Sequence, residues 1–208
     1  MMNLPPMILA SASPRRSELL KQLGVDFRVI PSDAEELHQQ DLTAREVCQI
    51  NAYRKAHAVA KKFPDALVLG ADTLVCLENE LLGKPRDLEA AYLMLERLQG
   101  KTHQVVTAIC LIHHRNRRQS VFSDVTEVTF RTLDSVQIQR YLIQTNPLDK
   151  AGAYAIQENG DLIVEKISGS YTNVVGLPVE MLREELGRWD GEASPNGASK
   201  NGKSSHAE

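Results

Sequence analysis

The sequence ALVLGADTLVCL, residues Ala66–Leu77, is an apolar and partly β-branched run of the kind found in a buried central strand. A single carboxylate, that of Asp72, interrupts the run. Burying this charge is costly unless a cation, a metal ion or hydrogen-bond donors compensate it, so Asp72 indicates a polar site on the strand. An aspartate at a strand end, held by backbone amides, is an equally common explanation of such a pattern.

The segments on both sides of this run alternate between strand and helix periodicities, which predicts a single α/β domain. Two β-rich segments joined by the polar Arg115–Arg118 predict an antiparallel hairpin, and hence a mixed, partly antiparallel central sheet flanked by helices. We expect strands at Met7–Ala10, Val25–Pro31, Ala66–Leu77, Thr102–His114, Gln119–Thr132, Tyr154–Gln157 and Asp161–Ile167. We expect helices from Pro14 to Gly24, Thr43 to about Lys62, Asp87 to Gly100 and Asp134 to Gln144, and one after Pro178.

Two of these helices carry clear start signals. Ser13 suits the N-cap and Pro14 the first position of the first helix. Thr43 and Glu46 form a capping box, in which each side chain accepts a hydrogen bond from the other residue's backbone N–H.

Length, charge and cysteine content limit the class of protein. The chain has 208 residues, 42% of them hydrophobic, which is enough to bury one sizeable core. The formal net charge of −3 provides no basic field, so we expect no general binding to nucleic acid or to membranes. Three separated cysteines and the lack of a signal peptide or a long apolar run predict a cytoplasmic protein without structural zinc. We divide the chain into one domain, residues 1–189, and a tail, residues 190–208, whose composition predicts disorder.

The segment Ser11-Ala12-Ser13-Pro14-Arg15-Arg16 lies where the first strand leads into the first helix. The free N–H groups of a helix N-terminus, two hydroxyls and two arginines together suit phosphate oxygens. A capped helix with two solvated arginines explains the motif alone equally well. No Gly-Lys-Ser/Thr follows, so the segment is not a P-loop.

Acidic and cationic residues elsewhere also suit a phosphorylated ligand. Together with Glu35 and Glu36, Asp72 supplies enough carboxylates for a hard divalent cation that bridges carboxylate and phosphate oxygens, which implies Mg²⁺ or Mn²⁺. The lysine of Gly83-Lys84-Pro85 lies in a tight turn that suits a positioned phosphate contact. Lys55 is weaker evidence, because a lysine on a helix face is usually only solvated.

Several of these segments, in their order along the chain, resemble the Maf proteins, which are nucleoside triphosphate pyrophosphatases. The resemblance extends over roughly Ile8–Leu186 and implies an α/β fold of the Maf and inosine-triphosphatase type, with a homodimer as a possible assembly. It rests on the blocks Leu9–Arg16, Gly70–Thr73, Gly83–Pro85, Lys150–Gln157, Gly169–Tyr171 and Val175–Pro178.

The resemblance implies hydrolysis of a nucleoside triphosphate between its α and β phosphates, with a divalent metal cation as cofactor. It places the catalytic aspartate at Asp72 and the phosphate-binding and metal-supporting residues at Ser13, Arg16, Glu36, Lys55 and Lys84. We therefore expect Asp72, Lys84 and Arg16 to be catalytic and Glu36 and Asp72 to support the metal, with Glu35 as the alternative to Glu36. Whether Asp72 acts as a base or as a metal ligand stays open at this point.

Three positions, Arg15, Thr73 and Gln157, resemble the branch of the family that acts on dTTP and UTP. The branch that acts on 7-methyl-GTP usually has Trp, Gln and Glu there. Gln157 offers both a donor and an acceptor, which suit the edge of uracil or thymine. We therefore expect a dTTP and UTP pyrophosphatase, which could also take modified pyrimidine nucleotides. The alternatives are a 7-methyl-GTP pyrophosphatase and a nucleotide-binding regulator of septum formation.

Overall fold

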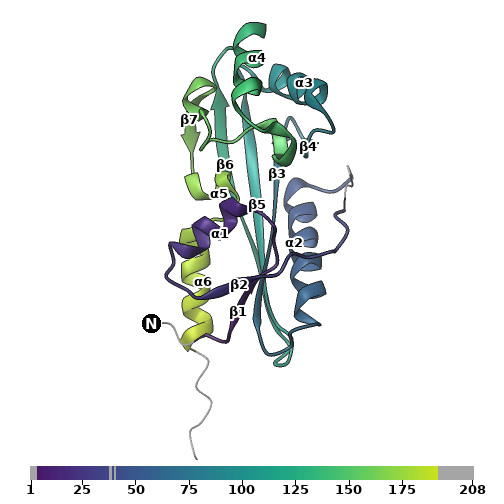
Figure 1. Cartoon of the computed structure of the whole chain (residues 1–208), viewed down its shortest axis with the longest axis vertical. Helices are drawn as coiled ribbons and strands as arrows, with labels where there is room; N and C mark the ends of the chain where they lie inside the picture. The colour runs from purple at the N-terminus through teal and green to yellow at the C-terminus, as the bar shows by residue number, and fades with distance from the viewer. Residues whose placement is uncertain (1–3, 38, 40, 192–208) are drawn as a thin grey trace, which may run out of the picture.

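The computed structural model describes residues 4–37, 39 and 41–191. They form one mixed sheet of seven strands, in the order β2-β1-β3-β5-β6-β7 with β4 also paired to β3, flanked by helices (Figure 1). The predicted fold class is therefore confirmed. The strands are β1 Met7–Leu9, β2 Phe27–Val29, β3 Leu67–Leu77, β4 Glu80–Leu82, β5 Thr102–His113, β6 Arg118–Phe130 and β7 Val164–Ser168. The α-helices are α1 Pro14–Lys21, α2 Ala44–Ala60, α3 Leu88–Leu98, α4 Ser135–Gln144, α5 Tyr171–Val175 and α6 Val179–Gly191, and the 3₁₀-helices are η1 Pro147–Asp149, η2 Ala151–Ala153 and η3 Gly160–Leu162.

The central strand β3 has one edge that is only partly covered. Along its other edge, β5 pairs antiparallel with Leu67–Cys76 without interruption. On the partly covered edge, β1 pairs parallel with Leu67–Leu69, and β4 pairs antiparallel with Val75–Leu77. Among the described residues, no strand lies beside residues 70–74 on that edge, so the sheet has a gap there.

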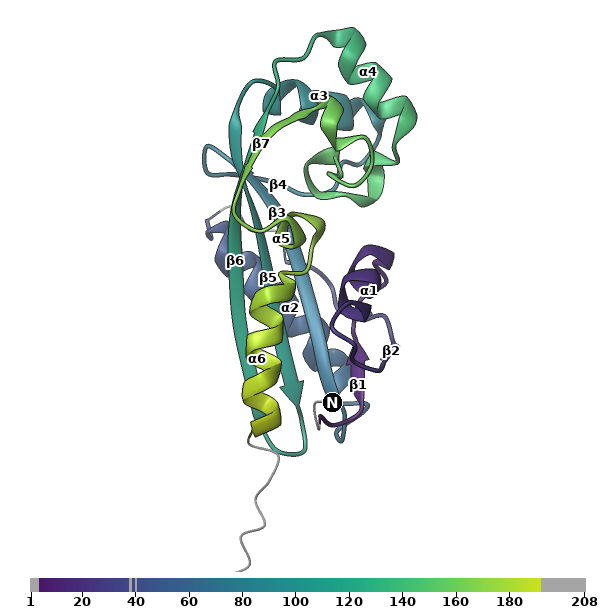
Figure 2. The same cartoon turned by 90° about the vertical axis from the view of Figure 1, so that its left-hand side faces the viewer.

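Helices cover both faces of the sheet, and Figure 2 shows α2 on one side and α1 with α6 on the other. Because side chains of a strand alternate between faces, Val68 and Leu74 of β3 pack in the core under α2. Leu67 and Leu69 pack in the second core, which α1 and α6 close. A third core joins α3 and α4 to the far ends of the long strands and to η2. Figure 1 shows α3 and α4 at the top of the molecule.

The segment Tyr154–Gln157, which we expected to be a strand, is instead an irregular turn after η2. The reason is visible in its hydrogen bonds, because the hydroxyl of Tyr141 on α4 donates to the carbonyl of Ala155 (3.2 Å) and accepts from its N–H (3.0 Å). A buried side chain thus replaces the neighbouring strand that Ala155 would otherwise need. The positive φ of 64° at Ala153 is a further departure from an extended chain.

Several other elements differ from expectation, among them β4, which was not expected. The last strand begins at Val164 rather than at Asp161, which lies in η3, and the short helix α5 was not expected. Helix α6 includes Asp190 and Gly191, which we expected to be disordered, and the remainder of that expected tail, residues 192–208, lies outside the described residues. Within the described part of the chain, no helix combines the length and the apolar character needed to cross a bilayer.

Candidate active site

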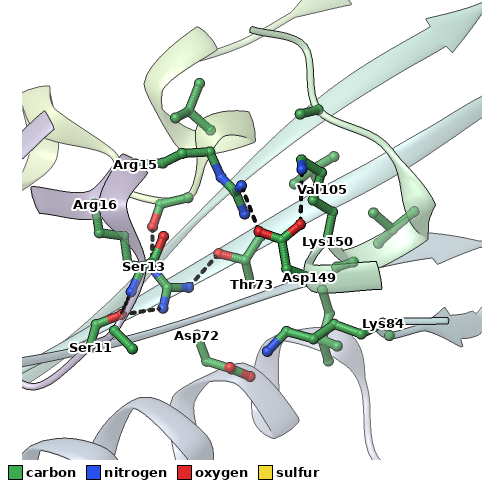
Figure 3. A pocket seen from close by; sticks show the side chains of 18 of the residues that line it. Ser11, Ser13, Arg15, Arg16, Asp72, Thr73, Lys84, Val105, Asp149 and Lys150 are labelled. Carbon is green, nitrogen blue, oxygen red and sulfur yellow. Dashed lines mark hydrogen bonds and ion pairs between the residues drawn. The ribbon is translucent and has the colours of Figure 1, made fainter. Parts of the chain in front are cut away.

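A cleft of about 740 Å³ opens at the gap in the sheet beside β3 (Figure 3). The loop that follows β1 borders it on one side, and the turn after β4 and the segment from η1 to Gln157 border it on the other. The structure brings together in this cleft all of the site residues predicted from the sequence: Ser13, Arg15, Arg16, Glu36, Lys55, Asp72, Thr73, Lys84 and Gln157.

Asp72 is only 6% exposed, and its charge is compensated by two donors from α2. It has the same alternation as Val68 and Leu74, so its side chain points to the α2 face of the sheet. Lys55 Nζ lies 2.7 Å from Asp72 Oδ1, and Asn51 Nδ2 lies 3.1 Å from Oδ2. Both carboxylate oxygens therefore accept hydrogen bonds, which suits the ionised form.

Glu36 joins this cluster through the same lysine. Lys55 Nζ lies 2.7 Å from Glu36 Oε1 as well as 2.7 Å from Asp72 Oδ1, so one ammonium bridges two carboxylates. Glu35 is exposed, and its backbone carbonyl accepts a hydrogen bond from Arg54 on the outside of α2. Of the two glutamates, Glu36 is the one that faces the cleft. We call Glu36, Lys55, Asp72 and Asn51 the α2 end of the cleft.

Asn51 is a site residue that the sequence analysis missed. Its amide accepts from the N–H of Leu37 (2.7 Å) and donates to the carbonyl of Leu37 (3.1 Å), while the same Nδ2 reaches Asp72. Asn51 thereby fixes the backbone next to Glu36 as well as the catalytic candidate Asp72. The available signal was its position four residues before Lys55, which places both side chains on one face of the helix.

Gly70 allows α2 to approach β3 closely enough for these contacts. A Cβ built at this position would lie closer than 3.0 Å to the backbone of Ala52 and Ala56 on α2. Because these are backbone atoms, no side-chain rotation could relieve the clash. The absence of a side chain at Gly70 thus sets the distance from Asp72 to its partners on α2.

Arg16 enters the cleft from α1 and is held by three protein acceptors. Its Nε donates to the carbonyl of Gly176 (2.9 Å), one terminal nitrogen to Ser11 Oγ (3.2 Å) and the other to Thr73 Oγ1 (3.0 Å). Burial lowers the pKa of this guanidinium from its ordinary value, and the nearby carboxylate of Asp72 acts in the opposite direction. Three of its five N–H groups are committed to the protein, which leaves two for a ligand.

Ser13 and Lys84 have uncommitted polar groups in the cleft. Ser13 occupies the N-cap position of α1, but its hydroxyl makes no capping hydrogen bond, contrary to the role expected from its position. The N–H of Ser13 instead donates to Ser11 Oγ (3.2 Å). Lys84 is exposed and makes no hydrogen bond or ion pair with any described residue, and Figure 3 shows it extending toward the side of the cleft where Asp72 lies.

At its other end, the cleft is lined by a chain of ion pairs. Arg15 lies 3.2 Å from one oxygen of Asp149 in η1, the buried Lys150 lies 2.9 Å from the other, and Lys150 also pairs with Glu158 (3.2 Å). Desolvation acts to raise the pKa of Asp149, but Lys150 and Arg15 outweigh it, so this pKa lies below its ordinary value. Gln157 is exposed here and makes no hydrogen bond with a described residue. We call Arg15, Asp149, Lys150 and Gln157 the η1 end of the cleft.

The comparison with protein families agrees with this geometry. A family model described as Maf-like protein matches residues 6–189. The chain belongs to the Maf family. The resemblance stated from the sequence blocks is thereby confirmed.

Among the relatives of this Maf chain, a protein of Bacillus velezensis named dTTP/UTP pyrophosphatase is 50% identical over 173 residues, 83% of this chain and 90% of its own. A protein of Akkermansia muciniphila with the same name is 46% identical over 176 residues, 85% of this chain and 92% of its own. A solved HAM1 protein from Coxiella burnetii aligns with 89% of this chain and 100% of its own at 15% identity, with a TM-score of 0.47.

The carboxylates of this Maf chain fit a divalent cation that is shared with a ligand. In the described part of the chain, no three acidic, histidine or cysteine side chains come close enough together to hold a metal ion by themselves. Glu36 Oε1 and Asp72 Oδ1 both contact the Lys55 ammonium at 2.7 Å, which holds the two carboxylates near each other and leaves them further lone pairs for a cation. Mg²⁺ is commonly bound by one or two carboxylates plus substrate phosphates and water, and this donor set meets that requirement.

Proposed function

We propose that this Maf protein is a nucleotide pyrophosphatase that hydrolyses dTTP and UTP to the monophosphate and pyrophosphate. Relatives that are 42–50% identical over most of the chain are named dTTP/UTP pyrophosphatase, which supports both the reaction and the substrates. The observation that carries the proposal most strongly is the combination in one cleft of the buried Asp72, the fixed Arg16, and Lys84, which has no partner among the described residues.

The cations would bind the triphosphate and stabilise the charge that develops on the leaving pyrophosphate. Arg16 retains two N–H groups after its three protein contacts, and Lys84 retains all of its donors. Preorganised donors of this kind are worth most in a partly buried site, where water does not screen them. The free hydroxyl of Ser13 would add a further donor or acceptor for a phosphate oxygen.

Asp72 would orient or deprotonate the water that attacks the α phosphorus. Lys55 and Asn51 each donate a hydrogen bond to its carboxylate and hold it in a fixed position, which a general base requires. Glu36 and Asp72 would hold the divalent cation, Mg²⁺ or Mn²⁺, which when bound supplies positive charge to phosphate oxygens. Lys55 would remain a partner of both carboxylates and set their orientation.

The η1 end would hold the base. The side-chain amide of Gln157, which makes no hydrogen bond with a described residue, offers both a donor and an acceptor to the edge of a pyrimidine at this end, whereas Arg16 and Lys84 keep donors for the phosphates. Arg15 and Gln157 would contact the base there, and Thr73, between the ends, would contribute through its contact with Arg16. We also propose that the protein works in the cytoplasm, where nucleoside triphosphates are made and used.

The proposal is tested by turnover on a panel of dTTP, UTP, CTP, GTP and 7-methyl-GTP with Mg²⁺ or Mn²⁺, with detection of released pyrophosphate. We expect dTTP and UTP to give the highest kcat/KM. A preference for 7-methyl-GTP would overturn the substrate assignment and leave the pyrophosphatase reaction intact. Binding of nucleotides without any release of pyrophosphate would instead support a binding protein, such as a regulator of septum formation.

A further inference from the structure

Arg16 is held by a chain of hydrogen bonds that leads out of the cleft into the core. Thr73 Oγ1, which contacts Arg16, lies 2.9 Å from Thr107 Oγ1 on the neighbouring strand β5. Thr107 Oγ1 in turn lies 2.9 Å from the backbone carbonyl of Asn173 in α5. Thr107 is fully buried and is not among the residues that line the cleft.

The direction of every bond in this chain follows from the donors that each group possesses. A carbonyl only accepts, so the single hydroxyl hydrogen of Thr107 goes to Asn173. Thr73 must then donate its own hydrogen to Thr107, because Thr107 has none left. The Thr73 oxygen is consequently free to accept from Arg16, and a guanidinium only donates.

Helix α5 is anchored firmly enough to serve as the end of this chain. The buried side-chain amide of Asn173 donates to the carbonyl of Val105 on β5 (3.0 Å) and to Thr126 Oγ1 on β6 (2.9 Å). The residue that follows α5, Gly176, supplies the carbonyl that accepts from Arg16 Nε. Apart from Ser11, the guanidinium of Arg16 therefore has two supports, and both come from α5 or the residue after it. The carbonyl of Gly176 holds it directly, and the carbonyl of Asn173 holds it through Thr107 and Thr73.

We propose that Thr107 is a positioning residue for Arg16, acting through Thr73. This inference rests on the proposed function in so far as Arg16 contacts the phosphates. Without the Thr107 hydroxyl, Thr73 has no acceptor in the core and is free to rotate, and Arg16 loses an oriented acceptor. A small displacement of a group that contacts the reacting phosphates costs up to about 100-fold in rate.

The test compares Thr107→Val, which keeps the shape of the side chain and removes the hydroxyl, with Thr107→Ser, which keeps the hydroxyl and removes the methyl group. For dTTP hydrolysis, we expect kcat to fall about tenfold or more in Thr107→Val. We expect Thr107→Ser to stay within about threefold of the wild type. Equal losses in the two variants would mean that packing matters and the hydroxyl does not, which would overturn the proposal.

A spectroscopic measurement without any substrate separates this inference from the proposed function. The ¹⁵N–¹H signal of Arg16 Nε can be assigned by its loss in Arg16→Lys. We expect this signal to shift or to exchange faster with water in Thr107→Val, and to match the wild type in Thr107→Ser. An unchanged signal in Thr107→Val would overturn the positioning role, whereas a wild type that hydrolyses no nucleotide would overturn the function alone.

Should Thr107→Val not fold, Thr107→Ala removes the same hydroxyl without placing a second methyl group in the core, and the same outcomes apply.

Discussion

The two ends of the cleft are built in different ways. At the α2 end, Asn51, Lys55 and Asp72 project from a long helix and the central strand, Glu36 reaches them from a loop, and the charges of Asp72 and Lys55 compensate each other. At the η1 end, Asp149, Lys150 and Gln157 lie on a 3₁₀-helix and in turns, and the half-exposed Asp149 pairs with Arg15 of α1. Helix α2 and strand β3 hold Asp72 and two of its partners in a fixed geometry, whereas a turn holds Gln157, which we propose to read the base.

The ends also differ in the ionisation of the groups behind them. The η1 end is backed by the buried His103, whose Nε2 lies 2.7 Å from the hydroxyl of Tyr154, a residue of the cleft wall. Burial lowers the pKa of His103 to about 4 and raises that of Tyr154, so both are neutral near pH 7. The η1 end thus has ion pairs along the cleft and titratable groups without charge behind them.

The largest effect should come from the α2 end. Asp72→Asn keeps the size of the side chain and removes its charge, so we expect kcat for dTTP and UTP to fall at least about 100-fold. Lys55 retains Glu36 as a partner, so the thermal midpoint should hardly fall. Near-normal turnover in this variant would show that the α2 end is not the reacting end.

A change at the η1 end should alter substrate choice and spare the chemistry. In a variant that combines Arg15→Trp with Gln157→Glu, we expect kcat/KM for dTTP and UTP to fall about 100-fold, while that for 7-methyl-GTP holds or rises. Asp149→Asn is the control: it removes the ion pairs with Arg15 and Lys150 but keeps both base-contacting side chains, so the order of preference among nucleotides should be retained. A parallel loss on all nucleotides would mean that this end does not discriminate between bases.

The adjacent glutamates offer a sharper test of the α2 end. Glu36→Gln removes a carboxylate from the cleft, and we expect the Mg²⁺ concentration needed for half-maximal activity to rise about tenfold. Glu35→Gln changes an exposed neighbour and should leave that concentration within about twofold of the wild type. The reverse result would assign the metal-supporting role to Glu35.

The neutral groups behind the η1 end predict a dependence of stability on pH. Between pH 6.5 and about 4, the folded state binds fewer protons at His103 than the unfolded state, so acidification favours unfolding. The full difference corresponds to about 3 kcal/mol in the free energy of unfolding. We expect His103→Gln, which does not titrate, to flatten the measured decline over this range. An equal decline in the variant and the wild type would place the acid sensitivity elsewhere.

The sequence predicted the regular elements well and the irregular ones poorly, for reasons that lie in single contacts. Asp72 was identifiable because a lone carboxylate in an apolar strand demands compensation, and the capping box at Thr43 and Glu46 was found as expected. Tyr154–Gln157 was misread because Tyr141, distant in sequence, provides the hydrogen bonds that a neighbouring strand would have provided.

The partners of the cleft residues were the least predictable part of the site. The η1-end pair between Arg15 and Asp149 joins residues 134 positions apart, and no local pattern announces it. That Glu36 and not Glu35 pairs with Lys55 depends on the path of the loop between β2 and α2. Such contacts follow from the tertiary arrangement and not from the periodicity of any one segment.

The close approach of α2 to Gly70 has a consequence for how this protein tolerates mutation. Position 70 touches no ligand group, yet any side chain there would push the helix that carries Asn51 and Lys55 away from Asp72. In a saturation library selected for activity, we expect no substitution at position 70 to survive, not even alanine, just as we expect none to survive at position 72. A scan of that kind would therefore mark as essential a residue whose contribution is the space that it leaves open.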